Sequence, residues 1–134
     1  MVRRILDTSV LIDHWRTFRS RTAGNMTKPD AHACAEQLIR VQDTNWIVPP
    51  VEVEFLAGVR SQNELELAEA FLARFQVPEN GEVRAVDWRE ARRLACRVPR
   101  DGKARDLGDC LIRAIASRIR AHTLSLDKRF PRRG

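Results

Sequence analysis

"MVRRILDTSVLID" (residues 1–13) begins the chain and contains the transition that decides the fold. Residues 2–6 indicate a short strand, and the apolar spacing over residues 10–15 indicates a helix. Thr8 and Ser9, between these segments, are residues that favour a helix N-terminus. Asp7 therefore stands in an apolar run where strand gives way to helix, and a carboxylate in that position requires an explanation.

The composition is that of one folded domain, residues 1–134. Of the 134 residues, 43% are hydrophobic and 31% are charged, which allows one hydrophobic core and differs from the composition of disordered chains. No apolar stretch is long enough to span a bilayer, and Asp7 and Asp13 interrupt the run that a signal peptide would need. We expect a single cytoplasmic domain with no membrane association.

The cysteines indicate neither a disulfide framework nor a zinc site. Cys34, Cys96 and Cys110 are odd in number and lack the spacing of metal ligands. Two of them lie among small apolar residues, where a free cysteine behaves as a small hydrophobic residue. We expect three free thiols.

Positive charge is concentrated towards the C-terminus. The formal net charge is +6 and the pI is about 10.2. Residues 113–133 contain seven Lys or Arg residues and a single acid, Asp127. Because a positive field raises the rate of encounter with anions, this distribution favours a phosphate backbone or an acidic protein as partner.

Strand and helix patterns alternate along the rest of the chain. Further strands are predicted at residues 46–48, 83–86 and 123–126, and helices lie between them. Such alternation implies right-handed crossovers, so we predict an α/β fold with a parallel sheet of four to five short strands and helices on both faces. Ligands of such sheets bind at the carboxyl ends of the strands, where Asp7 and Asp127 fall.

Several acids stand in apolar surroundings at the beginnings of predicted elements. They are Asp7, Glu52, Glu54, Asp106, Asp109 and Asp127. Carboxylates gathered within a few ångströms repel one another unless cations compensate their charge. Because carboxylate and water oxygens are the ligands that Mg²⁺ and Mn²⁺ prefer, we predict a divalent metal site that meets substrate phosphates.

Helix geometry favours one member of each neighbouring pair of acids. Glu52 and Glu54 lie about 200° apart on a helix, so one alone can face the cluster. We choose Glu54, which has Gly58 on the same face and thus room for close approach. Asp109 lies deeper in the apolar pattern than Asp106, which makes Asp109 the better ligand and Asp106 a supporting residue or a further ligand. Taken singly, each acid is explained as well by a helix cap, a first-turn acid or a solvated residue.

Four segments in order resemble the PIN-domain ribonucleases, in particular the VapC-like toxins of bacterial toxin-antitoxin pairs. They are LDTSVLID (residues 6–13), EFLAG (54–58), DCLIRAIA (109–116) and LSLDKRF (124–130). Each segment alone is weak evidence, but the four occur in the family's order over nearly the whole chain.

The resemblance implies an endoribonuclease that depends on Mg²⁺ or Mn²⁺. It assigns catalysis and metal binding to Asp7, Glu54, Asp109 and Asp127, and it gives Thr8, Ser9 and Ser125 supporting roles beside the metal site. The implied reaction is in-line attack of an activated water on an RNA phosphodiester, which leaves a 5′-phosphate. The implied partners are RNA such as tRNA or rRNA, an acidic VapB-like antitoxin that inhibits the enzyme, and a second copy in a homodimer.

Arg113 departs from the family pattern, which usually has a small residue there. It shares a helix face with Asp109, so it either pairs with that carboxylate or contacts RNA phosphate together with Lys128 and Arg129. A charge at this position would also weaken metal binding, so a catalytically weak PIN-like module that binds RNA or a partner stays the alternative. A phosphohydrolase for small esters is disfavoured because no Asp-x-Asp pair follows the first strand.

Overall fold

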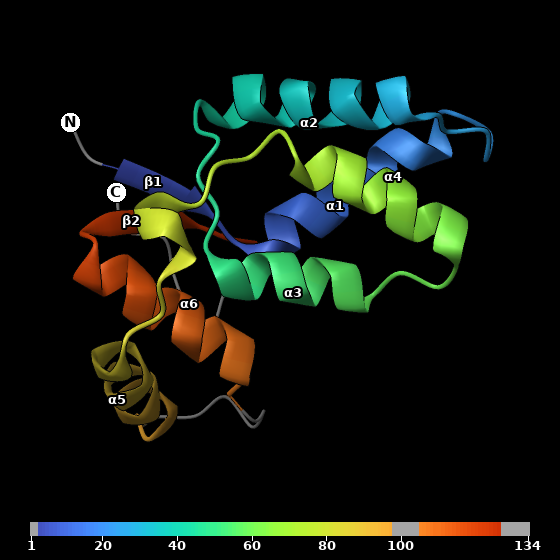
Figure 1. Cartoon of the computed structure of the whole chain (residues 1–134). Helices are drawn as coiled ribbons and strands as arrows, with labels where there is room; N and C mark the ends of the chain where they lie inside the picture. Colours follow the sequence, from blue (N-terminus) through green and yellow to red (C-terminus); the bar gives the residue numbers. More distant parts are fainter. Residues whose placement is uncertain (1–2, 98–104, 127–134) are drawn as a thin grey trace.

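Helices dominate the fold, which is a computed structural model that describes residues 3–97 and 105–126 (Figure 1). Two short parallel strands accompany them, so the predicted α/β class is confirmed. In chain order the elements are β1 (Arg3–Leu6), α1 (Thr8–Ser20), α2 (Lys28–Gln42), α3 (Pro49–Ala57), α4 (Gln62–Leu72), η1 (Pro78–Gly81), α5 (Ala85–Ala95), α6 (Leu107–Arg118) and β2 (Ala121–Leu124).

The sheet is narrower than predicted. β1 pairs in parallel with β2, with Leu6 opposite Leu124. Two single-residue bridges extend the parallel pairing on the other side of β1, from Ile5 to Trp46 and from Trp46 to Gln76. Four chain segments thus lie side by side, but two of them form strands in the described residues, and the predicted number of four to five strands is wrong.

Two of the predicted strands fail for local reasons. In place of the strand predicted at residues 46–48, the chain forms single-residue bridges at Trp46, because α3 begins immediately afterwards at Pro49. Residues 83–86 do not form a strand, because α5 begins at Ala85. At that helix start the Asp87 carboxylate accepts a 2.8 Å hydrogen bond from the backbone N–H of Arg84, as in a capping box.

Caps also decide where two other helices begin. Helix α2 begins at Lys28 because Thr27 and Asp30 cap it reciprocally. Helix α4 begins after Ser61, whose hydroxyl accepts a 3.1 Å hydrogen bond from the backbone N–H of Glu64.

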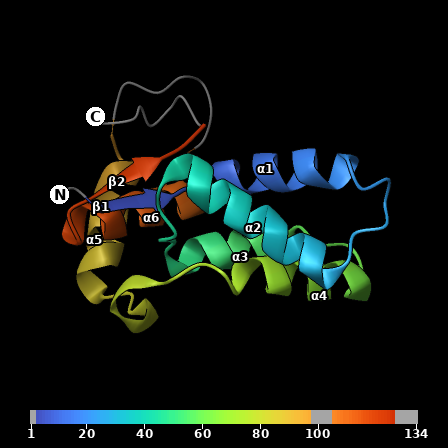
Figure 2. The same cartoon turned by 90° about the horizontal axis from the view of Figure 1, so that it is seen from above.

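Helices flank the strands from both sides. In Figure 1, α5 and α6 lie below the strands and α2 lies above them, and Figure 2 shows the two strands side by side at one end of α1, α2 and α3. The core joins these layers through fully buried residues such as Ile5, Phe71 and Ile112. Phe71 contacts both Trp15 and Phe55, at ring-centroid distances of 4.9 and 5.2 Å. No helix in the described ranges has the length and apolar character needed to cross a lipid bilayer.

The cysteines are free, as expected. Cys34 and Cys110 are buried, whereas Cys96 is exposed just after α5. Burial in apolar surroundings makes a thiol a packing residue, so the first two contribute to the core.

Candidate functional site

Asp7 lies between β1 and α1 with 2% of its surface exposed. It occupies the N-cap position of α1, but its side chain makes no capping hydrogen bond. Instead, Oδ2 accepts hydrogen bonds from the hydroxyls of Ser9, at 3.0 Å, and Ser125, at 2.7 Å. The reading of Asp7 as a simple helix cap is therefore wrong, and two hydroxyls orient its carboxylate.

The two serines tie the carboxyl ends of both strands together. Ser125 directly follows β2, and its hydroxyl lies 3.4 Å from that of Ser9. The backbone N–H of Leu126 donates to the Ser9 hydroxyl at 3.0 Å, and that of Asp7 donates to the Leu124 carbonyl at 2.9 Å. Asp7 thus lies where both parallel strands end.

Glu54 reaches the same region from α3. The Thr8 hydroxyl donates a 2.5 Å hydrogen bond to its Oε1. Its carboxylate rests against Gly108 in the first turn of α6, so closely that a Cβ at this position would lie 2.5 Å from Cδ of Glu54. The site therefore brings a carboxylate to the positive end of the α6 dipole.

Burial and two neighbouring acids affect the charge of Glu54. Burial raises the pKa of Glu54, the hydrogen bond from Thr8 opposes this effect, and the negative charges of Asp106 and Asp7 raise the pKa further. For Glu52, burial raises the pKa. Mutual repulsion of this kind is what a bound cation relieves.

The other predicted residues fall into two groups. Asp106 was predicted as a first-turn acid or a supporting residue; it is the N-cap of α6, accepts a 3.1 Å hydrogen bond from the Gly108 N–H, and its charge also raises the pKa of Glu54. Asp109 lies in the first turn of α6 and Arg113 one turn later, both half-buried. Outside the described residues lie Asp127, Lys128 and Arg129.

A family comparison accounts for this arrangement. The model of the PIN domain matches residues 4–134, which is nearly the whole chain. The chain belongs to the PIN domain family. PIN domains are generally metal-dependent nucleases, so a hydrolase is the activity class that membership supports. No curated protein matches the chain.

The donor atoms of this PIN domain suit a hard divalent cation. Within residues 3–97 and 105–126, no three His, Cys, Asp or Glu side chains stand close enough to hold a metal ion. The groups that converge on the strand ends are carboxylates and hydroxyls, and oxygen is the donor that Mg²⁺ and Mn²⁺ select. The space left by the missing Cβ of Gly108 is filled by one of these carboxylates. In donor chemistry, these oxygens are therefore of the kind that such an ion selects.

Gly108 is the site residue that sequence reasoning missed in this PIN domain. One signal was present, because a glycine inside the first turn of a helix is a poor helix former. Its partner, Glu54, lies on another helix, however, and spacing along the chain does not reveal a contact between two helices.

Proposed function

We propose that this PIN domain is an Mg²⁺- or Mn²⁺-dependent endoribonuclease toxin of the VapC type, silenced by an acidic antitoxin. One observation carries the proposal, namely that the buried Asp7 and the half-buried Glu54 meet where two parallel strands end, with the adjacent Thr8 hydroxyl bonded to Glu54. Membership of a family of nucleases supports the same class of reaction.

The proposed ligands are Asp7, Glu54, Asp109 and Asp127. When bound, the divalent ion stabilises charge on the reacting phosphate and activates the attacking water. The chain contributes orientation, because Ser9 and Ser125 fix the Asp7 carboxylate and Thr8 fixes that of Glu54. Groups held in this way do not have to reorganise when the reaction occurs.

The proposed macromolecular partners follow from charge. A net charge of +6 favours RNA as substrate and an acidic VapB-like protein as inhibitor. For RNA contact we propose Arg113 in α6, together with Lys128 and Arg129. A homodimer and a structured target such as tRNA or rRNA belong to the same proposal.

Cleavage of labelled RNA by the purified chain tests the enzyme. We expect cleavage in Mg²⁺ or Mn²⁺, loss of cleavage in excess chelator, and 5′-phosphate ends on the products. Asp7→Asn should lower the rate about 100-fold, equivalent to about 2.7 kcal/mol of transition-state stabilisation. Asp13→Asn removes an exposed acid from the same helix and should leave the rate unchanged. Equal cleavage in chelator, or by Asp7→Asn, would reject the proposal.

Growth of bacterial cells tests the toxin assignment separately. Expression of the chain should arrest growth, and Asp7→Asn should abolish the arrest. Co-expression of a small acidic protein encoded beside this chain should also relieve it. Cleavage in vitro without growth arrest would leave a ribonuclease that is not a toxin.

Arg113 supports a second candidate, a catalytically weak module that binds RNA or a partner. The charged side chain stands one turn after Asp109, on a half-buried part of α6. RNA binding that needs no metal and leads to no cleavage would favour this candidate.

A further inference from the structure

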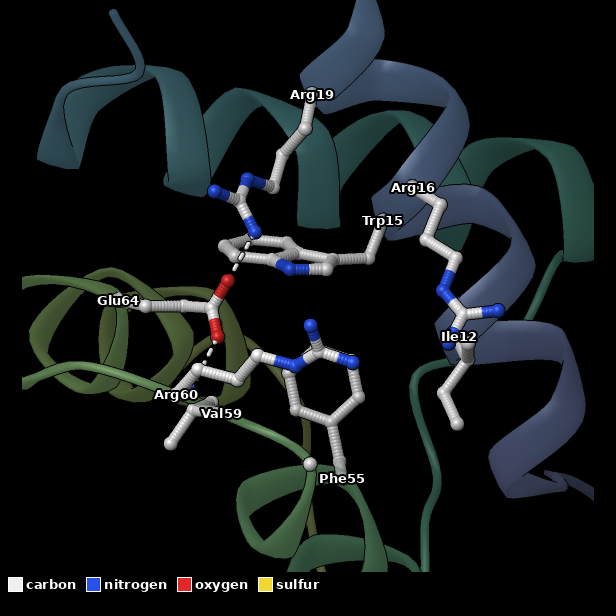
Figure 3. Close-up of a pocket in the computed structure, with 9 residues that line it drawn as sticks. Ile12, Trp15, Arg16, Arg19, Phe55, Val59, Arg60 and Glu64 are labelled. Carbon is white, nitrogen blue, oxygen red and sulfur yellow. Dashed lines mark hydrogen bonds and ion pairs between the residues drawn. The ribbon is translucent and has the colours of Figure 1, made fainter. Parts of the chain in front are cut away.

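A second polar site lies further along α1, the helix that carries Thr8, and beside the C-terminal end of α3, the helix that carries Glu54. It is a pocket of about 290 Å³ between the later turns of α1, the end of α3 and the start of α4 (Figure 3). Its volume is at the lower end of small-ligand pockets, which run from roughly 300 to 1,000 Å³. The residues that matter for its chemistry are Trp15, Arg16, Arg19, Phe55, Arg60 and Glu64.

The single carboxylate of the pocket is already engaged. Glu64 forms an ion pair with Arg19 and accepts a 2.8 Å hydrogen bond from the backbone N–H of Arg60. Burial would raise the pKa of Glu64, but these two contacts and the positive charges of Arg19 and Arg60 hold it below its usual value. Arg19 also stands over the Trp15 ring, 5.9 Å from the centroid. Glu64 and Arg19 therefore neutralise each other.

Two guanidinium groups remain for a ligand. Arg16 and Arg60 are exposed, and neither guanidinium forms an ion pair with a carboxylate of the described residues. Figure 3 shows them reaching towards the pocket from two sides, Arg16 from α1 and Arg60 from the segment before α4. Two planar cations that converge on one space match a phosphate or a carboxylate.

The aromatic rings of the pocket are closed to a ligand. Trp15 and Phe55 are 6% and 5% exposed, and they contact each other edge to face at 5.6 Å. A nucleobase therefore has no free ring on which to stack. The ligand is recognised by its negative charge alone.

The pocket continues the face of α1 that meets the acids. Thr8, Ile12 and Arg16 follow at intervals of four residues, which places them on one helix face. Along the helix, Arg16 lies about 12 Å from Thr8. A stacked nucleic-acid strand covers that length in about three to four nucleotides at roughly 3.4 Å each.

We propose that the Arg16–Arg60 pocket binds a backbone phosphate of the RNA substrate, a few nucleotides from the phosphodiester that is cleaved beside Asp7 and Glu54. The proposal rests on the proposed ribonuclease function. RNA is favoured over an acidic peptide because the pocket and the acids share one face of α1. A contact to phosphate positions the strand without reading its sequence.

Binding measurements test the pocket apart from catalysis. The test variant combines Arg16→Ala with Arg60→Ala, and the matched control combines Arg89→Ala with Arg92→Ala, two exposed arginines of α5. Both are made on the Asp7→Asn background and titrated with a labelled single-stranded RNA of twelve nucleotides in chelator. The logarithm of the RNA association constant falls linearly with the logarithm of the salt concentration. In the test variant this dependence should be shallower by about 0.7, the value for one phosphate contact on a single strand. The control should keep its slope.

Uncharged linkages placed in the RNA show which backbone phosphate the pocket binds. Single methylphosphonate substitutions along the RNA should weaken binding to the Asp7→Asn chain strongly at one position, and the test variant should be insensitive at that position. In chains with Asp7 intact, the Arg16 and Arg60 substitutions should raise KM about tenfold and leave kcat within twofold, as expected for uniform binding.

The outcomes separate the two proposals. Failure of the unmodified chain to cleave RNA overturns the ribonuclease function. If the unmodified chain cleaves RNA but the test variant equals the control in affinity, salt slope and methylphosphonate profile, the phosphate pocket is overturned and the ribonuclease function is not. If the test variant binds RNA as the control does but no longer binds a labelled oligoglutamate peptide, the pocket belongs to an acidic protein segment. That result also overturns the proposal.

Discussion

Gly108 matters because it has no side chain. A Cβ there would lie 3.0 Å from Oε1 of Glu54 and closer still to Cδ. Within a helix, alanine is more favourable than glycine by about 1 kcal/mol. The glycine therefore costs α6 some stability and provides the space in which the Glu54 carboxylate lies.

Gly108→Ala should separate activity from stability. The new methyl group forces the flexible end of Glu54 away from α6, so we expect RNA cleavage to fall at least about tenfold, or about 1.4 kcal/mol. The thermal unfolding midpoint should stay or rise. Ser117→Ala is the control, since it places the same methyl group at an exposed position of the same helix, away from Glu54. Full activity of Gly108→Ala would mean that the position of Glu54 is unimportant.

At the scale of residues, the sequence pattern identified several side chains that lie together where the two strands end. Asp7, Thr8 and Ser9 are neighbours in sequence, and Glu54 was chosen by helix periodicity. The Arg16–Arg60 pocket was not predicted, because it depends on how α1, α3 and α4 pack.

Helices α5 and α6 are joined by one buried ion pair. Arg118 donates to both carboxylate oxygens of Asp87, at 2.7 and 3.0 Å, and also to Oε1 of Glu79 at 2.5 Å. Asp87 is 1% exposed. A carboxylate so deeply buried depends on its partner, because an uncompensated charge in the interior is costly.

Arg118→Ala should destabilise the fold by about 3 kcal/mol, because it leaves Asp87 buried without its cation. Arg93→Ala serves as the control, since it breaks an exposed pair with Glu90 on α5 and should cost less than about 0.5 kcal/mol. Urea unfolding monitored by circular dichroism measures both free energies. Equal losses for the two variants would contradict a structural role for the Asp87 pair.

The same pair predicts a loss of stability in acid. Burial would raise the pKa of Asp87, but hydrogen bonds from Arg118 and from the backbone of Arg84 outweigh it and hold the pKa below its usual 3.8. Because the carboxyl binds its proton less readily in the folded chain, it stabilises the fold above about pH 4 and ceases to do so as the pH falls through the folded pKa. The difference in unfolding free energy between the unmodified chain and Arg118→Ala should therefore shrink between pH 5 and pH 2, as measured by urea titration. A difference in unfolding free energy that stays constant over this pH range would show that protonation of Asp87 is not linked to stability.

At the scale of elements, helices were predicted better than strands. Amphipathic spacing and N-terminal helix signals are local, so the helix that follows Asp7, α1, was predicted from the sequence. The stretch 83–86 is apolar enough for a strand, but Asp87 starts a helix there. Whether a short segment becomes a strand depends on its neighbours in space, as the lone bridge at Trp46 illustrates.

The whole molecule protects two of its three thiols. Burial raises the pKa of Cys34 to about 12, and Cys110 is 2% exposed. Iodoacetamide at pH 8 should therefore modify Cys96 in the native chain, and the other two cysteines after unfolding in urea, since the thiolate is the reactive form. Mass spectrometry of tryptic peptides shows the order in which the three cysteines are modified. Early modification of Cys34 would indicate a fold looser than described.

At the scale of the whole chain, the sequence predicted the α/β class and the order of the motifs. It did not predict the width of the sheet, because pairing between distant segments is a property of tertiary structure. The same holds for the repulsion between Asp106 and Glu54, which belong to different helices.

The hydrogen bond from Ser125 to Asp7 spans 118 positions of the chain. Contacts between such distant positions form late, since they must overcome the entropy of closing a long loop. A polypeptide emerging from the ribosome holds Asp7 long before Ser125 has been synthesised, so its carboxylate is not yet oriented. The proposed ribonuclease activity thus has to wait until the chain has been synthesised as far as Ser125, which limits attack on the RNA around the nascent polypeptide.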